Sequence, residues 1–195
     1  MNLDRPTLIT PAGLTPAGLT PADRVTLSRA GLLVLVAVLV LLRPLVDPGQ
    51  WGWAVLGVSV PMLLLDAVDG AVARRTVVTD RGARWDMETD AATVLVLSFA
   101  AAPAVGVWVI AAGLMRYAFV LAGAVLPALR GPLPPSQTRR VVAAVQGPAL
   151  LLAVAPGLPV AVAVVGCALA LGALTFSFGR DALALARGGA HPPKG

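Results

Sequence analysis

Residues 30–42 read AGLLVLVAVLVLL, an uninterrupted run of apolar side chains. Further apolar stretches follow at residues 53–65, 91–107, 108–126, 141–155 and 160–178. A helix of about 20 apolar residues crosses the hydrocarbon core of a bilayer. With short polar extensions, each stretch approaches that length. The pattern therefore predicts an all-α integral membrane protein, a bundle of about six transmembrane helices.

The composition agrees with this prediction and excludes several chemistries. Hydrophobic side chains make up 57% of the 195 residues and charged ones only 13%, and the mean hydropathy is +0.84. Soluble domains are about one-quarter charged. Cys167, His191 and Lys194 are the only residues of their types, which excludes disulfide frameworks, His/Cys zinc sites and P-loops. Carboxylates and arginines are left to carry any chemistry.

Both ends of the chain differ from the apolar middle. Residues 10–22 read TPAGLTPAGLTPA, a repeat rich in turn-forming residues that offers little to bury. Thr20 followed by Pro21 is typical of a helix start. We therefore expect a flexible N-terminal arm at 1–20, a six-helix membrane domain at 21–182 and a disordered C-terminal tail at 183–195.

The basic residues predict an orientation in the membrane. On a six-span path, all of the 15 basic residues except Arg43 and Arg116 fall on one side. Lys and Arg are enriched in cytoplasmic loops. We expect a multi-pass protein of the cell membrane with both termini cytoplasmic, and the net charge of +5 to reflect contact with the lipid bilayer and not with nucleic acid.

Six of the ten acidic residues lie between positions 66 and 90. Asp66 and Asp69 are three residues apart, and Asp86 and Asp90 are four apart, so each pair shares one face of a helix. Carboxylates gathered at a membrane boundary are costly unless cations compensate them. Oxygen ligands of this kind suit Mg²⁺ or Mn²⁺, and four of them can hold a two-metal site.

Other interpretations of these carboxylates stay open at this point. They could be solvated helix ends that pair with the arginines nearby at positions 74, 75, 81 and 84. They could also line the path of a membrane cation transporter, although a path would distribute them along the depth of several spans. A non-catalytic scaffold is a third alternative.

The carboxylates belong to a longer pattern of fixed residues. It reads Asp66-x-x-Asp69-Gly70-x-x-Ala73-Arg74, then Gly82-x-x-x-Asp86-x-x-x-Asp90. This pattern is similar to the signature of the class I CDP-alcohol phosphotransferase (CDP-alcohol phosphatidyltransferase) family, whose members are six-helix membrane enzymes. The resemblance covers 25 residues, and the length and number of spans agree with it.

The resemblance implies a function and a set of roles. The enzyme would transfer a phosphatidyl group from CDP-diacylglycerol to a small alcohol and release CMP, in phospholipid biosynthesis on the cytoplasmic side. Asp66, Asp69, Asp86 and Asp90 would hold a pair of divalent metal ions, and Asp90 would also act as general base. The nucleotide would be seated by the remaining signature residues, Gly70, Ala73, Arg74 and Gly82. A homodimer is possible.

The acceptor alcohol is less well indicated. Arg116, Arg139 and Arg140 lie outside the signature, and they favour a phosphorylated acceptor because arginine binds phosphate well. Glycerol 3-phosphate is the first guess and inositol phosphate the second. Enzymes that make phosphatidylglycerol phosphate often have Asp-Pro-Leu-Ala-Asp at the last acidic pair, whereas residues 86–90 here read DMETD.

Several of these polar residues have a structural alternative. Arg116 could pair with a signature carboxylate, and Arg139 and Arg140 could anchor their helix at the membrane surface. Glu88, four residues after Arg84, is expected to form a surface ion pair with it. Arg29, with Thr26, resembles a Thr-x-x-Arg that often opens these enzymes, or simply anchors the first helix. In the last spans, Gln146 is expected to make a helix-to-helix hydrogen bond. Cys167 is expected to pack as a small hydrophobic side chain.

Overall fold

The computed structural model describes residues 21–73, 80–126 and 136–188, and within these ranges the chain is helical with short connections. The long helices are α1 (Pro21–Leu42), α2 (Pro48–Ala73), α3 (Asp80–Val105), α4 (Ile110–Val125), α5 (Gln137–Val154) and α6 (Val160–Gly188). Two single 3-10 turns, η1 (Arg43–Leu45) and η2 (Val107–Val109), follow α1 and precede α4. The prediction of an all-α bundle of about six helices is confirmed.

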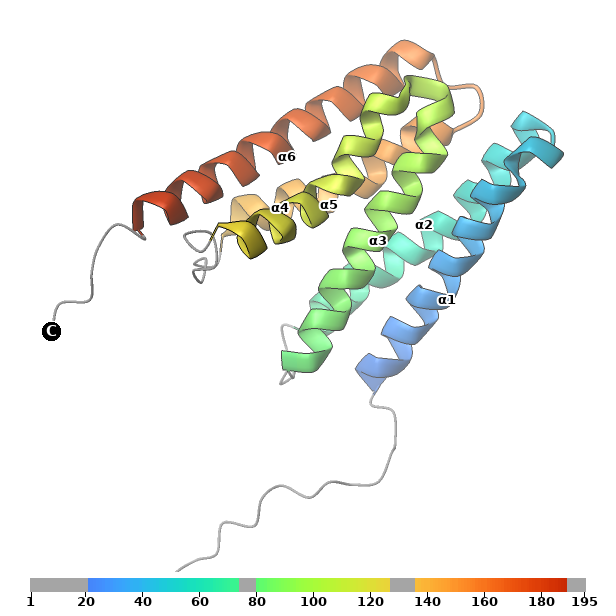
Figure 1. The fold of residues 1–195 in the computed structure, drawn as a ribbon. Coiled ribbons are helices and arrows are strands. Elements are labelled where there is room, and N and C mark those ends of the chain that lie inside the picture. Colours follow the sequence, from blue (N-terminus) through green and yellow to red (C-terminus); the bar gives the residue numbers. More distant parts are fainter. Residues whose placement is uncertain (1–20, 74–79, 127–135, 189–195) are drawn as a thin grey trace, which may run out of the picture.

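Four described segments are long and apolar enough to cross a membrane, namely Leu27–Leu45, Arg84–Val105, Val107–Val125 and Val160–Leu185. The remaining long helices, α2 and α5, have 26 and 18 residues, which corresponds to roughly 39 and 27 Å at 1.5 Å per residue. They lie beside the four segments in the same bundle (Figure 1). Large apolar side chains such as Leu41, Leu121, Leu169 and Phe176 are exposed, as expected for surfaces that face lipid.

The helix boundaries confirm some expectations and correct one. The first helix begins at Pro21, where the Thr-Pro pair predicted a start. At the other end, α6 extends to Gly188, so residues 183–188 are helical and the tail predicted from 183 begins too early. The predicted N-terminal arm and residues 189–195 lie outside the described residues.

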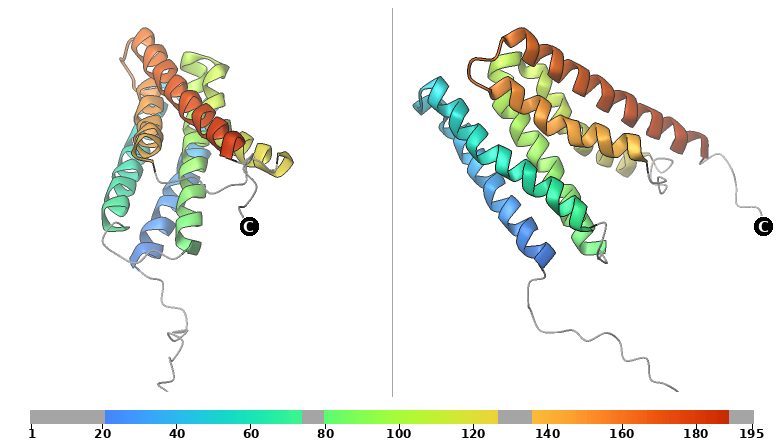
Figure 2. Two further views of the ribbon diagram at one scale, coloured as in Figure 1. Left: turned by 90° about the vertical axis from the view of Figure 1, so that its left-hand side faces the viewer. Right: turned by 180° about the vertical axis from the view of Figure 1, so that it is seen from behind.

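The six helices form two groups that meet at one end and separate at the other. The first group is α1, α2 and the amino-terminal half of α3, and the second is α4, α5 and α6 (Figures 1 and 2). Helix α3 joins them, since it packs against α1, α4 and α5. The connections α1–α2, α3–α4 and α5–α6 all lie where the groups meet. The start of α3 and the end of α2 lie at the far end of the first group, and the start of α5 and the end of α6 lie at the far end of the second.

The core lies where the groups meet. It contains Val36, Val55, Leu97 and Leu150, each at most 2% exposed, from four different helices. Glycine allows the closest approach: a Cβ on Gly113 of α4 would lie 2.5 Å from the backbone of Leu95 in α3. Small residues at such crossings are typical of membrane bundles, where association depends on close packing.

Two expectations for the pair α5 and α6 are confirmed. The Gln146 amide donates to the Ala170 carbonyl oxygen across the pair at 2.8 Å, so it makes the helix-to-helix hydrogen bond that was expected. The Cys167 thiol is 2% exposed and donates to the Ala149 carbonyl oxygen at 3.4 Å, and it belongs to the hydrophobic core. Both side chains therefore join helices together.

Candidate active site

The candidate site is built around Arg29 of α1. Its Nη1 donates to Oδ1 of Asp86 at 2.6 Å, and its Nη2 lies 2.7 Å from Oδ1 of Asp66. The same Nη2 also donates to Oδ1 of Asp90. The three carboxylates offer oxygen atoms that all lie within 4.8 Å of one another. We call these four residues the Arg29 cluster, and the end of the bundle where they lie the carboxylate end.

Each member of the Arg29 cluster continues the buried stripe of its own helix. Arg29 lies two turns before Val36, which is fully buried. On α2, Asp66 follows Ser59 and Met62, which are 0% and 1% exposed, at spacings of seven and four residues. Residues at these spacings share one helix face. Because α1 packs against both α2 and α3, the three stripes converge and bring the charged side chains together.

The third stripe, on α3, carries two of the carboxylates. Asp86 and Asp90 are followed on the same face by Thr93 and Leu97, which are 5% and 0% exposed. The hydroxyl of Thr93 donates to the Thr89 carbonyl oxygen at 2.8 Å, so this buried hydroxyl is already satisfied. Thr93 bonds within α3, whereas Asp86 and Asp90 on the same face bond to Arg29 of another helix.

Charge is unbalanced in the Arg29 cluster. Arg29 is only 2% exposed, whereas the side chains of Asp66, Asp86 and Asp90 are 39%, 47% and 49% exposed. One guanidinium on the buried side therefore faces three carboxylates that are open on their other side. Within the described residues Arg29 contacts only Oδ1 of each. Among the described residues, the cluster therefore combines three carboxylates with one guanidinium, and each carboxylate side chain stays partly exposed.

The other signature residues are only partly described. Asp69, Gly70 and Ala73 lie in the last two turns of α2, and Gly82 lies in the first turn of α3. Arg74 lies outside the described residues. The signature thus occupies the end of α2 and the beginning of α3, both at the carboxylate end (Figure 1).

Among the described residues, Arg116 pairs with Glu88 and with no signature carboxylate. Its Nη2 lies 2.7 Å from Oε1 of Glu88, which joins α4 to α3. Glu88 thus pairs with Arg116 of α4 in the described structure. It does not pair there with Arg84, which precedes it by four residues on α3. Helix α4 packs on α3 and brings a guanidinium to Glu88. The expectation of a local pair on α3 was wrong for this reason. The described signature carboxylates, of Asp66, Asp86 and Asp90, pair with Arg29 and not with Arg116.

A second charged cluster joins the start of α5 to the end of α6. Nε of Arg139 donates to Oδ2 of Asp181 at 2.8 Å, and Nη2 of Arg180 lies 3.6 Å from Oδ1 of the same carboxylate. Arg180 also donates to Oγ of Ser136 at 3.3 Å, the residue that caps the amino terminus of α5. We call Ser136, Arg139, Arg180 and Asp181 the Asp181 cluster. Arg140, the other arginine predicted here, is exposed.

Sequence reasoning missed part of each cluster. It gave Arg29 a minor role, and it did not single out Ser136, Arg180 or Asp181. A signal for Arg29 was present, because an arginine directly before the apolar stretch 30–42 is costly in lipid unless it has a partner. For Asp181 the signal was its position next to Arg180 at the end of the last apolar stretch.

Taken together, the fold and these contacts define a helical membrane protein with a cage of carboxylates at one end of the bundle. A family model described as CDP-alcohol phosphatidyltransferase matches residues 19–174 of the chain. The chain belongs to this family. Its members are phosphotransferases that move a phosphatidyl group from a CDP-alcohol to an acceptor, act in membranes in phospholipid biosynthesis, and generally use divalent metal ions. Comparison with curated proteins and with solved structures gave no significant match.

Proposed function

We propose that this protein transfers the phosphatidyl group of CDP-diacylglycerol to the hydroxyl of a small phosphorylated alcohol and releases CMP. The observation that carries the proposal is the Arg29 cluster, in which carboxylates from two helices offer oxygen atoms within 4.8 Å of one another. Membership of an enzyme family favours this activity over the cation transporter considered from the sequence. The gathering of the carboxylates at one end of the bundle agrees, since a transport path would need them along its depth.

The carboxylates fit a divalent metal ion by charge and by donor type. Asp66, Asp86 and Asp90 provide hard oxygen ligands, which Mg²⁺ and Mn²⁺ prefer. The three carboxylates and the Arg29 guanidinium give these four residues a formal excess of two negative charges, which one such ion would balance. Asp69, one turn from Asp66 on α2, is the further ligand that the signature implies for a second ion. A bound divalent ion supplies positive charge that offsets the charge of the CDP pyrophosphate.

Arg29 organises these ligands from the buried side. Its two terminal nitrogens hold one oxygen of each carboxylate, so the three side chains are oriented before substrate binds. Such preorganisation reduces the cost of arranging charged groups during the reaction. In this role Arg29 is a positioning residue, and the carboxylates are the groups that meet metal and substrate.

Asp90 is the general base in this proposal. Its carboxylate accepts the proton of the acceptor hydroxyl, and the resulting oxygen nucleophile attacks the phosphorus on the diacylglycerol side of the donor. The bond between that phosphorus and the bridging oxygen breaks, and CMP leaves with the electron pair. Half of the Asp90 side chain is exposed, which supports its access to a hydroxyl. The remaining signature residues, Gly70, Ala73, Arg74 and Gly82, are proposed to seat the nucleotide.

The Asp181 cluster supports an acceptor that carries a phosphate. Two guanidinium groups, of Arg139 and Arg180, lie beside one carboxylate there, so arginines outnumber carboxylates among the four residues of the cluster. A phosphate monoester suits such a site because arginine donates paired hydrogen bonds to it. Arg140 is a further candidate. Arg116 is a weaker one, since it pairs one to one with Glu88, whereas Asp181 is shared by two arginines. Glycerol 3-phosphate remains the first acceptor to test and inositol phosphate the second.

We also propose that this end of the bundle faces the cytoplasm. The helix ends at the carboxylate end and the connections between α2 and α3 and between α4 and α5 carry most of the basic residues, whereas Arg43 lies at the opposite end. An excess of Lys and Arg is typical of the cytoplasmic side. Labelling of single cysteines introduced at either end in intact cells measures this directly.

Release of CMP from CDP-diacylglycerol by the purified protein tests the proposed function. The assay contains Mg²⁺ or Mn²⁺ and one acceptor at a time: glycerol 3-phosphate, inositol 1-phosphate, inositol, serine or phosphatidylglycerol. We expect release to depend on a phosphorylated acceptor and to fall by about 10²- to 10⁴-fold in the Asp90→Asn variant. Release with an unphosphorylated acceptor alone would overturn the acceptor assignment. No release with any acceptor, from protein that binds metal, would count against the donor.

A further inference from the structure

The end of the bundle opposite the carboxylate cage holds an arginine that the proposed reaction does not use. Arg43 begins η1, directly after α1. It lies 14 residues after Arg29, which corresponds to about 21 Å along a helix. Its guanidinium carbon lies 5.4 Å from the centroid of the Trp51 ring. This separation places Arg43 near the other face of the membrane, far from the signature residues.

Trp51 is held in a fixed orientation beneath this arginine. Its side chain is 5% exposed, and its indole nitrogen donates to the Leu39 carbonyl oxygen at 2.7 Å. That hydrogen bond occupies the one polar group of the ring. The ring face is therefore free for the guanidinium, and stacking of this kind attracts the cation to the π electrons. The Arg43 guanidinium thus lies over the ring, and its N–H groups are the donors that it can offer to an anion.

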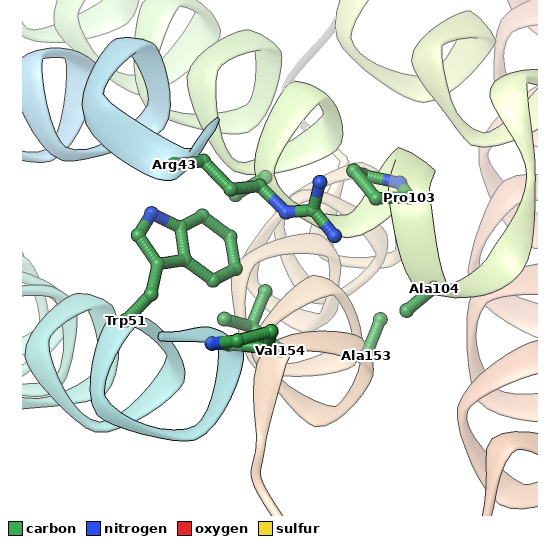
Figure 3. A pocket seen from close by; sticks show the side chains of 8 residues that line it. Arg43, Trp51, Pro103, Ala104, Ala153 and Val154 are labelled. Carbon is green, nitrogen blue, oxygen red and sulfur yellow. The ribbon is translucent and has the colours of Figure 1, made fainter. Parts of the chain in front are cut away.

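A pocket of about 160 Å³ opens beside Arg43 and Trp51. Figure 3 shows the Arg43 side chain extended across it, with the guanidinium between Trp51 and Pro103. The remaining lining residues are Pro48, Ala100, Ala104, Ala153 and Val154. Arg43 is the only charged side chain in this lining. The pocket combines apolar walls with one hydrogen-bonding cation, the usual make-up of a small-ligand site.

No ion pair of Arg43 is found in the part of the chain that the structure describes. The nearest carboxylate in the sequence is Asp47. Its Oδ1 accepts the backbone N–H groups of Gly49 and Gln50 at 3.0 and 3.1 Å, so it caps the start of α2. A guanidinium at a membrane boundary without a protein anion is a site for an external one.

We propose that Arg43 and Trp51 bind the phosphate diester of a phospholipid in the membrane leaflet opposite the carboxylate end. A phosphate group accepts paired hydrogen bonds from a guanidinium edge. The apolar walls of the pocket fit the glycerol and the first part of the acyl chains. Two residues from Arg43 or Trp51 along the chain, Leu41, Leu45 and Trp53 are 77%, 80% and 65% exposed, and in this proposal they contact the rest of the lipid. The site is independent of the proposed transferase reaction.

Native mass spectrometry of the purified, delipidated protein tests this site. Dioleoyl-phosphatidylglycerol is titrated in detergent, in parallel with dioleoylglycerol, which lacks the phosphate, and with glycerol phosphate, which lacks the chains. The variants are Arg43→Gln, Arg43→Lys and the matched control Arg84→Gln, an exposed arginine near the carboxylate end. Thermal unfolding in the same detergent confirms that each variant is folded.

We expect Arg43→Gln to weaken the retention of phosphatidylglycerol about tenfold, because a charge-assisted hydrogen-bond pair is lost. Arg43→Lys should lie between wild type and Arg43→Gln, and Arg84→Gln should match wild type. Equal retention by wild type and Arg43→Gln would overturn the proposal. Retention of dioleoylglycerol as tight as that of phosphatidylglycerol would overturn the phosphate contact, and binding of glycerol phosphate as tight as that of the lipid would overturn the lipid assignment.

Discussion

The two charged clusters at the separated ends of the helix groups have opposite compositions. In the Arg29 cluster one arginine meets three carboxylates, whereas in the Asp181 cluster two arginines meet one carboxylate. The first is built by α1, α2 and α3 and has excess negative charge. The second is built by α5 and α6 and contains two guanidinium groups for one carboxylate. Under the proposed function, the first group of helices would hold a cation and the second an anion.

This division matches the needs of a transferase that brings two anionic substrates together. A nucleotide diphosphate requires positive charge to compensate it, which the carboxylates can supply only by holding metal ions. An acceptor phosphate can be bound by arginine directly. If the comparison is correct, variants of the first cluster change metal binding and turnover, and variants of the second change the affinity for the acceptor.

The largest effect is expected for Asp90→Asn. An amide cannot accept the proton of the acceptor hydroxyl, so kcat for CMP release should fall by about 10²- to 10⁴-fold. Glu88→Gln is the matched control on the same helix, because Glu88 pairs with Arg116 outside the cluster. An Asp90→Asn enzyme with the kcat of the Glu88→Gln control would remove the assignment of the base.

The Arg29→Gln variant tests whether Arg29 positions the three carboxylates, as distinct from the role of the carboxylates in metal binding and catalysis. Removing the guanidinium deletes the three ion pairs that the structure describes for these carboxylates. We expect the metal-free protein to lose roughly 1–3 kcal/mol of stability, a value kept small because water screens the half-exposed carboxylates. That corresponds to a decrease in Tm of several degrees.

Added Mg²⁺ should then raise the Tm of Arg29→Gln more than that of wild type, since the carboxylates have more negative charge to compensate. Thermal unfolding in detergent, with Mg²⁺ or with a chelator, measures both quantities. Arg84→Gln serves as the control. Equal metal-free Tm values for wild type and Arg29→Gln would show that the three ion pairs do not stabilise the bundle.

Arg139→Gln tests the second cluster. It should raise KM for a phosphorylated acceptor about tenfold through the loss of a charge-assisted contact, with kcat and the KM for CDP-diacylglycerol nearly unchanged. Steady-state kinetics with each substrate varied in turn distinguish these parameters. Were kcat to fall while KM stayed constant, Arg139 would belong with the catalytic machinery or the fold and not with the acceptor.

Arg116→Ala should have the smallest effect. The Glu88 side chain in its ion pair is 55% exposed, and exposed pairs contribute at most about 1 kcal/mol. We expect KM for the acceptor to change less than twofold and Tm by a few degrees at most. A large increase in KM would move Arg116 into the acceptor site, which was one of its two interpretations from the sequence.

Most of the fold could be predicted from the sequence because apolar length is a local property. The apolar stretch at 30–42 lies within α1, and the stretch at 160–178 lies within α6. The ends of the helices were harder to predict from the sequence. Helix α6 continues to Gly188 because no proline or turn sequence stops it at 182, and the loss of apolar residues was taken for the end of the helix.

The sequence by itself determined the spacing of the carboxylates and hence which of them share a helix face, because helical periodicity fixes this within one element. Only the tertiary structure decided which charges meet. Arg29 reaches three carboxylates, Glu88 pairs with Arg116 instead of Arg84, and Asp181 lies between two arginines. These contacts join different helices, so they depend on how each helix is rotated and how closely it packs on its neighbours. The rotation and the separation of the helices are set by side-chain packing between them. The spacing of residues within a single helix therefore does not predict these contacts.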